Sequence, residues 1–379
     1  MNVSLRICLV GYGGIGKVHA YGYRNLHLYY DLPRPQLVGV VARTESSRRQ
    51  AIADHDFLWS HEDYQAAIIA EDVDIVDCCA PNHLHYPIAK LALDSRKAIY
   101  CEKPLALTLT EAAELAQQAQ NSGVPHQIAF NYRFVPAVLT ARELVRQGKL
   151  GKIVQFRGAY YHSGYWDRNR PLTWRMQKEF SGGGALYDLG SHIIDMIRFV
   201  TGDEYSSVSA TLHTEIKTRP LPEGGVGEVD VDDVAILQVK THSGALGTIE
   251  ASRLATGTED DLSFEIYGEK GALRFHLMEP NWLDWFDGAQ PGAPLSQAKG
   301  FTRLAASSRY PKPAKFPAGR SPMGWLQTHV ASQADFIQRC LGQEALGATF
   351  VDGLQVQRVL TAAQESDATR AWVAVDSLS

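Results

Sequence analysis

Asp188 and His192 have the side chains of a proton-transfer site and lie four positions apart in the chain. They follow a triple glycine at 182–184, in a stretch whose apolar residues recur at helical spacing. Residues four apart on a helix are neighbours, so we expect the carboxylate to lie beside the imidazole. A carboxylate orients an imidazole and raises its basicity, as a general base requires. An incidental polar pair on a helix face is the commoner origin of this spacing.

A Gly-x-Gly-x-x-Gly pattern at Gly11, Gly13 and Gly16 directly follows the apolar run 7–10. The first glycine permits a tight turn, the second lets a pyrophosphate approach, and the third lets a helix pack on a strand. Phosphates would then lie at a helix N-terminus, where free N–H groups favour negative charge. A turn that binds nothing is the alternative, because the chain contains 32 glycines. The predicted loop comprises Gly11, Gly13, Gly14, Ile15 and Gly16.

The end of the second expected strand bears on which dinucleotide is preferred. Proteins that bind NAD commonly carry an acid there to hold the ribose hydroxyls. Here the strand at 37–42 leads into Arg43, and no acid stands at that point. Arg43 and Arg48 would suit the 2′-phosphate of NADP, whereas Glu45 would suit a ribose. If both arginines only face solvent, they indicate neither cofactor. Both NAD and NADP are therefore retained as candidate cofactors, and the two arginines slightly favour NADP.

Two further segments follow expected strands, where ligands gather in a parallel sheet. The first contains Ala80, Pro81, Asn82 and His85, and the second contains Glu102 and Lys103. Taken alone, the first segment is more simply explained as a turn with surface histidines. The second segment is more simply explained as a surface turn with a solvated lysine.

The elements that must position these residues divide the chain into two parts. Up to about residue 130, strands alternate with helices, which predicts a doubly wound parallel Rossmann sheet. From about residue 150, strands joined by turns at 241–244 and 268–271 predict a large, mostly antiparallel open sheet. The expected class is α/β, with a Rossmann domain at 1–130 and a second α/β domain at 131–379. The C-terminal helix is a candidate to pack back on the first domain.

The expected strands are 4–10, 37–42, 74–80, 98–101, 127–130, 152–162, 206–217, 231–240, 245–254, 262–267 and 271–277. The expected helices include 62–70, 86–94, 110–121, 137–147, 186–200, 325–341 and 353–365. Residues 279–322 are rich in Pro, Gly, Ala and Ser. They are either a functional flap or contain a pair of strands that the sequence pattern does not reveal.

Composition argues against several classes of function. The net charge is −5 and no long basic block occurs, so no nucleic-acid partner is expected. No apolar stretch approaches the ~18 residues of a membrane span, and the N-terminus lacks signal-peptide features, so no membrane partner is expected. None of the five cysteines has metal-ligand spacing with histidine. We therefore expect reduced thiols, no metal and a cytoplasmic location.

Taken together, the motifs resemble those of the Gfo/Idh/MocA family of NAD(P)-dependent sugar and cyclitol dehydrogenases over nearly the whole chain. The motifs that carry the resemblance are Gly11-x-Gly13-x-x-Gly16, Pro81-Asn82-x-x-His85, Glu102-Lys103-Pro104, Asn131-Tyr132-Arg133, Gly183-Gly184-x-x-x-Asp188-x-Gly190-x-His192 and Tyr267-Gly268-x-x-Gly271. The segment 167–175 is similar to that of members acting on sugars and anhydrosugars.

The resemblance implies a reaction and the residues that carry it. Lys103 would lie between nicotinamide and the substrate hydroxyl, where an ammonium stabilises developing alkoxide charge. Asp188 and His192 would complete the site, with His192 taking the proton. Cofactor contacts are expected from Gly11, Gly13, Gly14, Ile15, Gly16, Arg43, Arg48, Ala80, Pro81, Asn82, His85, Glu102, Lys103 and Asn131. The resemblance also implies a homodimer or homotetramer formed through the open sheet face.

Aromatic and polar side chains are expected to form the substrate wall. Aromatic rings cover the C–H faces of a sugar, while arginine and histidine bond its hydroxyls. Core packing is the alternative for the aromatic residues, and surface pairing is the alternative for the arginines. The expected substrate residues are Lys103, Arg133, Tyr160, His162, Trp166, Trp174, Arg175, Tyr187, Asp188 and His192.

We therefore expect an oxidoreductase that transfers a hydride between NAD(P) and a secondary hydroxyl or ketone of a sugar, anhydrosugar or cyclitol. A non-catalytic NAD(P)-sensing regulatory protein, a dehydrogenase of a non-sugar substrate and an inactive paralogue are the alternatives. A sensor would be free to lose Lys103, Asp188 or His192, and this chain has all three.

Overall fold

The computed structural model describes residues 5–290, 299–309 and 321–378. Contacts between residues divide this described chain into two compact units. The first unit comprises residues 5–131 and 324–357 of the described chain. The second comprises residues 132–290, 299–309, 321–323 and 358–378. The sequence analysis assigned everything after residue 130 to the second domain, whereas the structure places the segment 324–357 in the first unit.

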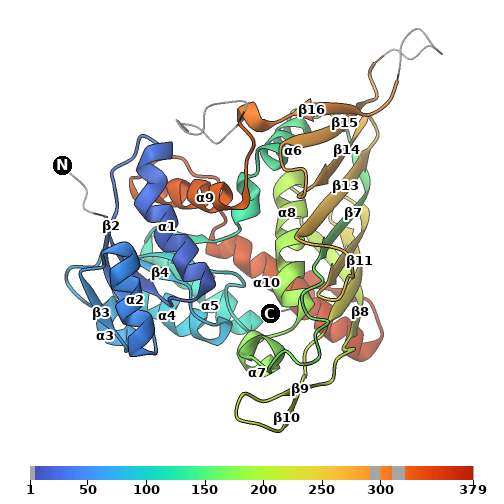
Figure 1. The fold of residues 1–379 in the computed structure, drawn as a ribbon. Coiled ribbons are helices and arrows are strands. Elements are labelled where there is room, and N and C mark those ends of the chain that lie inside the picture. The colour runs from blue at the N-terminus through green and yellow to red at the C-terminus, as the bar shows by residue number, and fades with distance from the viewer. Residues whose placement is uncertain (1–4, 291–298, 310–320, 379) are drawn as a thin grey trace. The chain divides into compact units, whose positions relative to one another are not determined.

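The first unit contains a six-stranded parallel sheet (Figure 1). Its strands, in order across the sheet, are β3 (Trp59–His61), β2 (Gln36–Val41), β1 (Arg6–Val10), β4 (Ile75–Cys78), β5 (Ala98–Cys101) and β6 (His126–Ile128). Ile7, Cys8 and Leu9 are fully buried, as expected for a parallel strand covered on both faces. The order reverses between β1 and β4, and dinucleotides bind at such a switch point.

The helices of the first unit include α9, which packs against α1. They are α1 (Gly14–Tyr29), α2 (Glu45–His55), α3 (Tyr64–Ile68), α4 (His85–Asp94), α5 (Leu109–Ser122), α9 (Trp325–Cys340) and the first part of α10 (Phe350–Thr369), through Gln357. Short 3-10 turns occur at Asn82–Leu84 and Asn131–Phe134.

Local signals set the ends of these helices. Thr108 and Glu111 form a reciprocal capping box at the start of α5. The helix ends at Gly123, which adopts a left-handed conformation with φ of +64°. The chain then enters β6, so the glycine–proline stop signal at 123–125 predicts this boundary correctly.

The second unit contains a nine-stranded sheet. Its strands, in order across the sheet, are β16 (Thr302–Ala305), β15 (Trp282–Asp287), β14 (Gly271–His276), β13 (Asp261–Gly268), β7 (Ile153–Tyr161), β12 (Leu246–Ser252), β11 (Val234–Thr241), β8 (Tyr205–His213) and β17 (Val373–Ala374). β7 and β12 pair in parallel and the other described neighbours are antiparallel. The expected class, α/β with a Rossmann sheet and a mostly antiparallel open sheet, is confirmed.

Helices α6 (Pro136–Arg146) and α8 (Ser191–Thr201) pack against each other and against one face of this sheet (Figure 1). α8 lies on β7 and β13, and α6 lies on β14 and β15. The remaining elements are the short helix α7 (Lys178–Ser181), a 3-10 turn at Trp174–Met176, and the small hairpin of β9 (Thr218–Pro220) and β10 (Val226–Glu228).

The segment 279–322 contains β15 and β16, so a missed pair of strands is correct for its described part. Residues 291–298 and 310–320 lie outside the described residues. β3, β9, β10 and β17 were also missed, because strands of two or three residues are too short to show a pattern. In the described ranges no helix combines the length and apolar character needed to cross a bilayer.

Candidate functional site

The glycine loop connects β1 to α1 in the first unit. Gly11 has a φ of +102°, and a Cβ there would lie 2.6 Å from the carbonyl oxygen of Cys79. A Cβ on Gly16 would lie 2.1 Å from the carbonyl oxygen of Gly11. A Cβ on Gly13 or Gly14 would meet nothing within 4 Å. The first and third glycines therefore allow close packing, as predicted, while the middle two leave open space beside the backbone.

The N-terminus of α1 has the features of an anion site. Gly13 is the N-cap, no side chain caps the helix, and its first turn holds no acid. The first N–H groups of such a helix lack intrahelical partners, and the helix dipole favours negative charge there. Because the open space of Gly13 and Gly14 adjoins these N–H groups, the loop fits a dinucleotide pyrophosphate.

The end of β2 holds one exposed arginine and one engaged arginine. Ala42 is buried and Arg43 is exposed. Arg48 donates hydrogen bonds to the carbonyl oxygens of Ala42 at 2.9 Å and Arg43 at 3.2 Å. Thr44 caps α2 by accepting a hydrogen bond from the N–H of Ser47. Arg48 therefore holds the strand end in place, which leaves Arg43 as the better candidate to contact a nucleotide.

His85 lies between the two loops that follow β4 and β5. Its side chain is buried, so the alternative of a surface histidine is wrong. Nδ1 lies 2.7 Å from the carbonyl oxygen of Pro104, and Nε2 lies 2.9 Å from that of Ala80. His85 thus connects the segment 80–82 to the segment 102–104, and acts on the loops rather than as a free ligand.

Glu102 is buried, whereas Lys103 is partly exposed. One carboxylate oxygen of Glu102 accepts a hydrogen bond from the backbone N–H of Lys103 at 3.2 Å. The other lies 3.2 Å from Nε2 of His19, a fully buried residue of α1. The simple surface turn is therefore wrong for Glu102, and the sequence analysis gave no role to His19.

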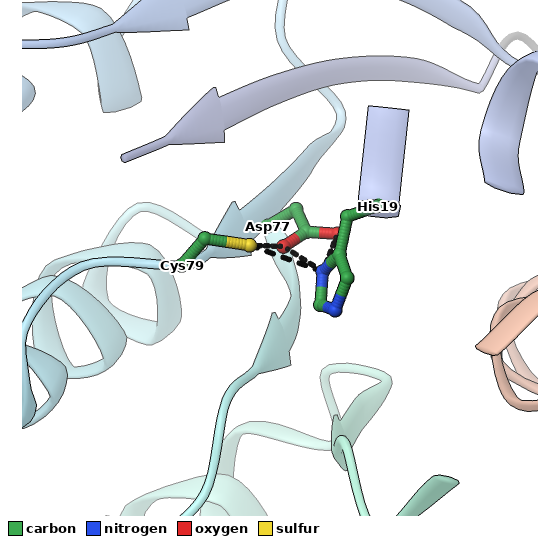
Figure 2. Close-up of side chains that lie close together, drawn as sticks. All are labelled: His19, Asp77 and Cys79. Atoms are coloured by element: carbon green, nitrogen blue, oxygen red, sulfur yellow. Dashed lines mark hydrogen bonds and ion pairs between the residues drawn. The ribbon is translucent and has the colours of Figure 1, made fainter. Parts of the chain in front are cut away.

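Figure 2 shows the other side of His19, where Asp77 and Cys79 lie. Nδ1 of His19 lies 2.9 Å from Asp77 and 3.1 Å from the sulfur of Cys79. Burial opposes a charge on His19, but the two carboxylates outweigh it and raise its pKa to about 10. The side chains of His19 and Cys79 both lie within hydrogen-bond distance of Asp77, so the trio forms a hydrogen-bonded network. The same three side chains lie close enough together to be a candidate ligand set for a metal ion.

Asn131 packs inside the first unit. It is buried, and its amide donates a hydrogen bond to the hydroxyl of Thr328 on α9 at 2.7 Å. Its side-chain amide is thus used to hold α9, which the expectation of a cofactor contact did not foresee.

In the second unit, a tight approach of backbones positions the segment of Asp188. A Cβ on Gly184 would lie 1.7 Å from the carbonyl oxygen of Asp232. The carboxylate of Asp232 accepts hydrogen bonds from the N–H groups of Gly184 and Leu186, both at 2.7 Å. These contacts explain the glycine at 184 and hold the start of the next helical turn.

Asp188 lies in that turn, Leu186–Gly190, which is a π-helix, and His192 lies in the first turn of α8. The spacing argument assumed a regular α-helix, which is wrong for this turn because a π-helix has a different residue spacing. Pairing of Asp188 with His192 stays a prediction. The carboxylate of Asp188 accepts a hydrogen bond from the buried guanidinium of Arg253 at 3.0 Å.

The ring of His192 lies among tyrosines. Its centroid is 5.1 Å from that of Tyr132 and 5.8 Å from that of Tyr160. Both tyrosine hydroxyls donate to the carboxylate of Asp260, at 2.9 and 2.6 Å, and Nε2 of His162 lies 3.0 Å from it. Burial would raise the pKa of Asp260, but these hydrogen bonds lower it. The structure thus brings Tyr160 and His162 to a carboxylate that the sequence analysis missed, and places the ring of His192 against the tyrosines that bind it.

Two residues expected in the substrate wall are buried and have partners in the protein. The guanidinium of Arg133 forms a buried two-point ion pair with Asp195 and lies over the ring of Phe199. Tyr187 is buried, and its hydroxyl donates to the side chain of Gln364 at 3.2 Å. Tyr187 has the core packing that was its alternative, whereas Arg133 is paired in the interior and not at the surface.

Three other expected wall residues are accessible. The ring of Trp166 is 41% exposed, with its indole N–H donating to the carbonyl oxygen of Leu254 at 2.6 Å. Arg175 is exposed and lies 4.3 Å from the centroid of the half-buried Trp174 ring. These side chains keep free surface for a ligand.

A parallel sheet with a glycine loop at its switch point, joined to a second α/β unit bearing a histidine and carboxylates, defines a dinucleotide-binding oxidoreductase. Residues 5–130 match the oxidoreductase family with an NAD-binding Rossmann fold, and residues 138–274 match the GFO/IDH/MocA C-terminal domain. The chain therefore belongs to the Gfo/Idh/MocA family, as its motifs indicated.

Individual relatives agree with this family assignment. The chain is 33% identical to levoglucosan dehydrogenase of Pseudarthrobacter phenanthrenivorans over 99% of both chains. A solved levoglucosan dehydrogenase in complex with NADH and levoglucosan matches with a TM-score of 0.92 at 33% identity, covering 98% of this chain and 100% of that one. An NAD binding oxidoreductase from Klebsiella pneumoniae matches with a TM-score of 0.91 at 35% identity, covering 98% and 99%. The protein is therefore a member of an oxidoreductase family with an NAD-binding Rossmann fold, whose relatives include dehydrogenases of levoglucosan, scyllo-inositol and D-glucosides.

Gly13→Ala and Gly16→Ala separate cofactor binding from packing. Gly16→Ala is expected to lower the melting temperature, because its Cβ would lie 2.1 Å from a carbonyl oxygen. Gly13→Ala is expected to keep the melting temperature and to weaken dinucleotide binding by about tenfold or more, or ~1.4 kcal/mol. Thermal denaturation and calorimetry measure the two effects. Wild-type cofactor affinity in Gly13→Ala would contradict the placement of the pyrophosphate.

Proposed function

We propose that this protein transfers a hydride between a nicotinamide dinucleotide and a secondary hydroxyl or ketone of an anhydrosugar or a similar pyranose. The observation that carries this proposal is the match to levoglucosan dehydrogenase over 99% of both chains. The accessible Trp166, Trp174 and Arg175 support it, because aromatic faces and a guanidinium suit a polyhydroxylated ring.

Lys103 and His192 are proposed to act on the same substrate. The ammonium of Lys103 stabilises charge on the reacting oxygen, and His192 accepts or returns the hydroxyl proton. When bound, the nicotinamide supplies the hydride acceptor or donor. Asp188 is a positioning residue in this proposal, held in turn by Arg253.

The side chains around Asp260 are proposed to hold the imidazole of His192 in place. Tyr132 and Tyr160 contact the ring, and their hydroxyls are fixed on one carboxylate. A fixed ring keeps the proton-accepting nitrogen aimed in one direction, which proton transfer requires. His162, on the same carboxylate, is proposed to contact the substrate.

We propose that the protein uses NAD and that Arg43 also lets it accept NADP. Arg43 is exposed at the end of β2, where no acid follows Ala42. A guanidinium there suits a 2′-phosphate, and the lack of an acid removes the usual repulsion against it.

Two copies are proposed to associate through the sheet face opposite α6 and α8. Ile236, Leu246 and Trp282 are exposed there at 49, 54 and 42%. Side chains that lie opposite one another on five neighbouring strands alternate in charge across this face: Arg157, Glu265, Arg274, Asp284 and Arg303.

Light scattering is expected to give a dimer or tetramer mass, and a monomer at micromolar concentration would contradict this proposal.

A cytoplasmic location is also proposed. All five cysteines are free thiols and four of them are buried, as is usual in a reducing compartment. Recovery of the protein outside the cytoplasm after cell fractionation would contradict it.

Lys103→Met tests the proposed function together with a panel of anhydrosugars, monosaccharides and inositols. The wild-type protein is expected to change the nicotinamide absorbance with at least one anhydrosugar or pyranose, and Lys103→Met to lower kcat by about 10²–10³-fold. Lys90→Met, an exposed lysine of α4, is the matched control and should retain wild-type rates. Wild-type turnover in Lys103→Met would remove Lys103 from the mechanism, and silence over the whole panel would overturn the substrate class.

Arg43→Asp tests cofactor choice. The change removes a cation and adds an anion, so the ratio of kcat/KM for NADP to that for NAD is expected to fall by about tenfold or more. Arg49→Asp is the control, because Arg49 is an exposed arginine of α2 paired only with nearby Glu45 in the described structure. An unchanged ratio in Arg43→Asp would show that Arg43 does not contact the 2′-phosphate.

A further inference from the structure

His19 occupies the centre of a buried charge network behind the proposed catalytic lysine. It lies on the second turn of α1 and has no exposed surface, and Asp77 likewise has none. Nδ1 of His19 lies 2.9 and 3.1 Å from the two oxygens of Asp77, and Nε2 lies 3.2 Å from Glu102. Each ring nitrogen therefore faces a carboxylate oxygen.

Two carboxylates around one imidazole favour a proton on both ring nitrogens, with Asp77 as the hydrogen-bond partner of Nδ1 and Glu102 within ion-pair distance of Nε2. A neutral imidazole has one N–H, so one nitrogen lone pair would face a carboxylate oxygen. A buried carboxylate without a compensating charge is also costly. The imidazolium places one positive charge beside both carboxylates, which agrees with the pKa of about 10 for His19. Burial would raise the pKa of Glu102, but the adjacent His19 lowers it to about 2.

The network reaches the lysine through the backbone. The free oxygen of the Glu102 carboxylate accepts the N–H of Lys103, and the N–H of Glu102 donates to the carbonyl oxygen of Cys78 at 2.9 Å. Glu102 is thus held by its backbone to β4, by its side chain to α1, and by its carboxylate to the next residue. The orientation of the Lys103 backbone depends on where that carboxylate lies.

The other groups that face His19 are titratable but do not replace it. Cys79 contacts Nδ1 at 3.1 Å, and burial raises the pKa of that thiol. Tyr100 of β5 and His329 of α9 place their ring centroids 5.3 and 5.7 Å from that of His19. Burial and Asp77 raise the pKa of Tyr23. Asp77 and Glu102 are the two carboxylates of this group, and the His19 ring lies between them.

We propose that His19 is a positioning residue, which as an imidazolium bridges Asp77 and Glu102 and holds the Glu102 carboxylate against the N–H of Lys103. It thereby aligns Lys103 for the hydride-transfer step without touching substrate or cofactor. This inference rests on the proposed role of Lys103, while the charge state of His19 is independent of that role.

Nuclear magnetic resonance of ¹⁵N-labelled histidine measures the charge state directly. The chain has 13 histidines, so the signal missing from His19→Gln identifies His19. We expect two protonated ring nitrogens at pH 8 in the wild-type protein, because the pKa lies near 10. In Glu102→Gln one carboxylate is lost, so the pKa of His19 is expected to fall. A neutral His19 at pH 8 in the wild-type protein would overturn the proposal, whether or not the enzyme turns over.

Kinetics of His19→Gln measure the positioning effect. Glutamine keeps a hydrogen-bond donor but carries no charge, so Glu102 loses its positively charged partner. We therefore expect kcat to fall about 10–100-fold, as is usual when catalytic groups are misaligned. The dissociation constant for NAD, measured by calorimetry, should stay near the wild-type value. Tyr100→Phe is the control, since it removes an equally buried hydrogen bond, to Ser332, beside the same ring.

The outcomes separate this inference from the proposed function. A wild-type kcat in His19→Gln, or an equal loss in Tyr100→Phe, would show that His19 only stabilises the fold. If His19→Gln does not fold, Glu102→Gln still tests the proposal. A His19 pKa that is the same in Glu102→Gln and in the wild-type protein would overturn the proposed imidazolium bridge between Asp77 and Glu102. Full turnover in Lys103→Met would instead overturn the proposed function and leave the imidazolium bridge intact.

Discussion

The common ending of three neighbouring strands is the constraint on which the nucleotide half of the site depends. Val10 of β1 pairs with Cys78 of β4, and Cys78 pairs with Cys101 of β5, and each of these residues ends its strand. The glycine loop and the segments starting at Cys79 and Glu102 therefore leave the sheet in one row. α1 starts from the same row, which is why its second turn can place an imidazole between side chains from β4 and the loop after β5.

Fixed charged groups occur in both units. A buried ion is tolerated only when an opposite charge and hydrogen bonds satisfy it, as for buried Arg253. Partly exposed Asp188 pairs with Arg253, and partly exposed Asp260 accepts hydrogen bonds from two tyrosine hydroxyls. Such groups have few alternative positions, so the side chains that they contact are held as well. Each unit thus places one proposed catalytic group, Lys103 or His192, beside a network of fixed charges.

Much of the architecture follows from local pattern. The apolar runs, the glycine and proline punctuation and the helical periodicity predicted most strands and helices within a few residues, including the stop at Gly123. Strands of two or three residues were missed because so few positions show no alternation. The turn containing Asp188 was taken as a regular helix, since nothing in the side-chain spacing distinguishes the π-helix there. Arg133 and Tyr187 have residue types that suit a sugar site and a core equally well.

The residue types and their order were enough to determine the dinucleotide loop, the α/β class and the family, because these depend on short-range geometry that glycines, caps and strand patterns encode locally. The partners of the charged groups were decided only by the tertiary structure. His19 and Glu102 are separated by more than a whole strand–helix repeat, and their pairing depends on the register of β1, β4 and β5. The same holds for Asp260, whose hydrogen bonds to Tyr132 and Tyr160 join residues that are remote in the chain. Burial makes such pairs obligatory, but only the packed sheet determines which residues are buried together.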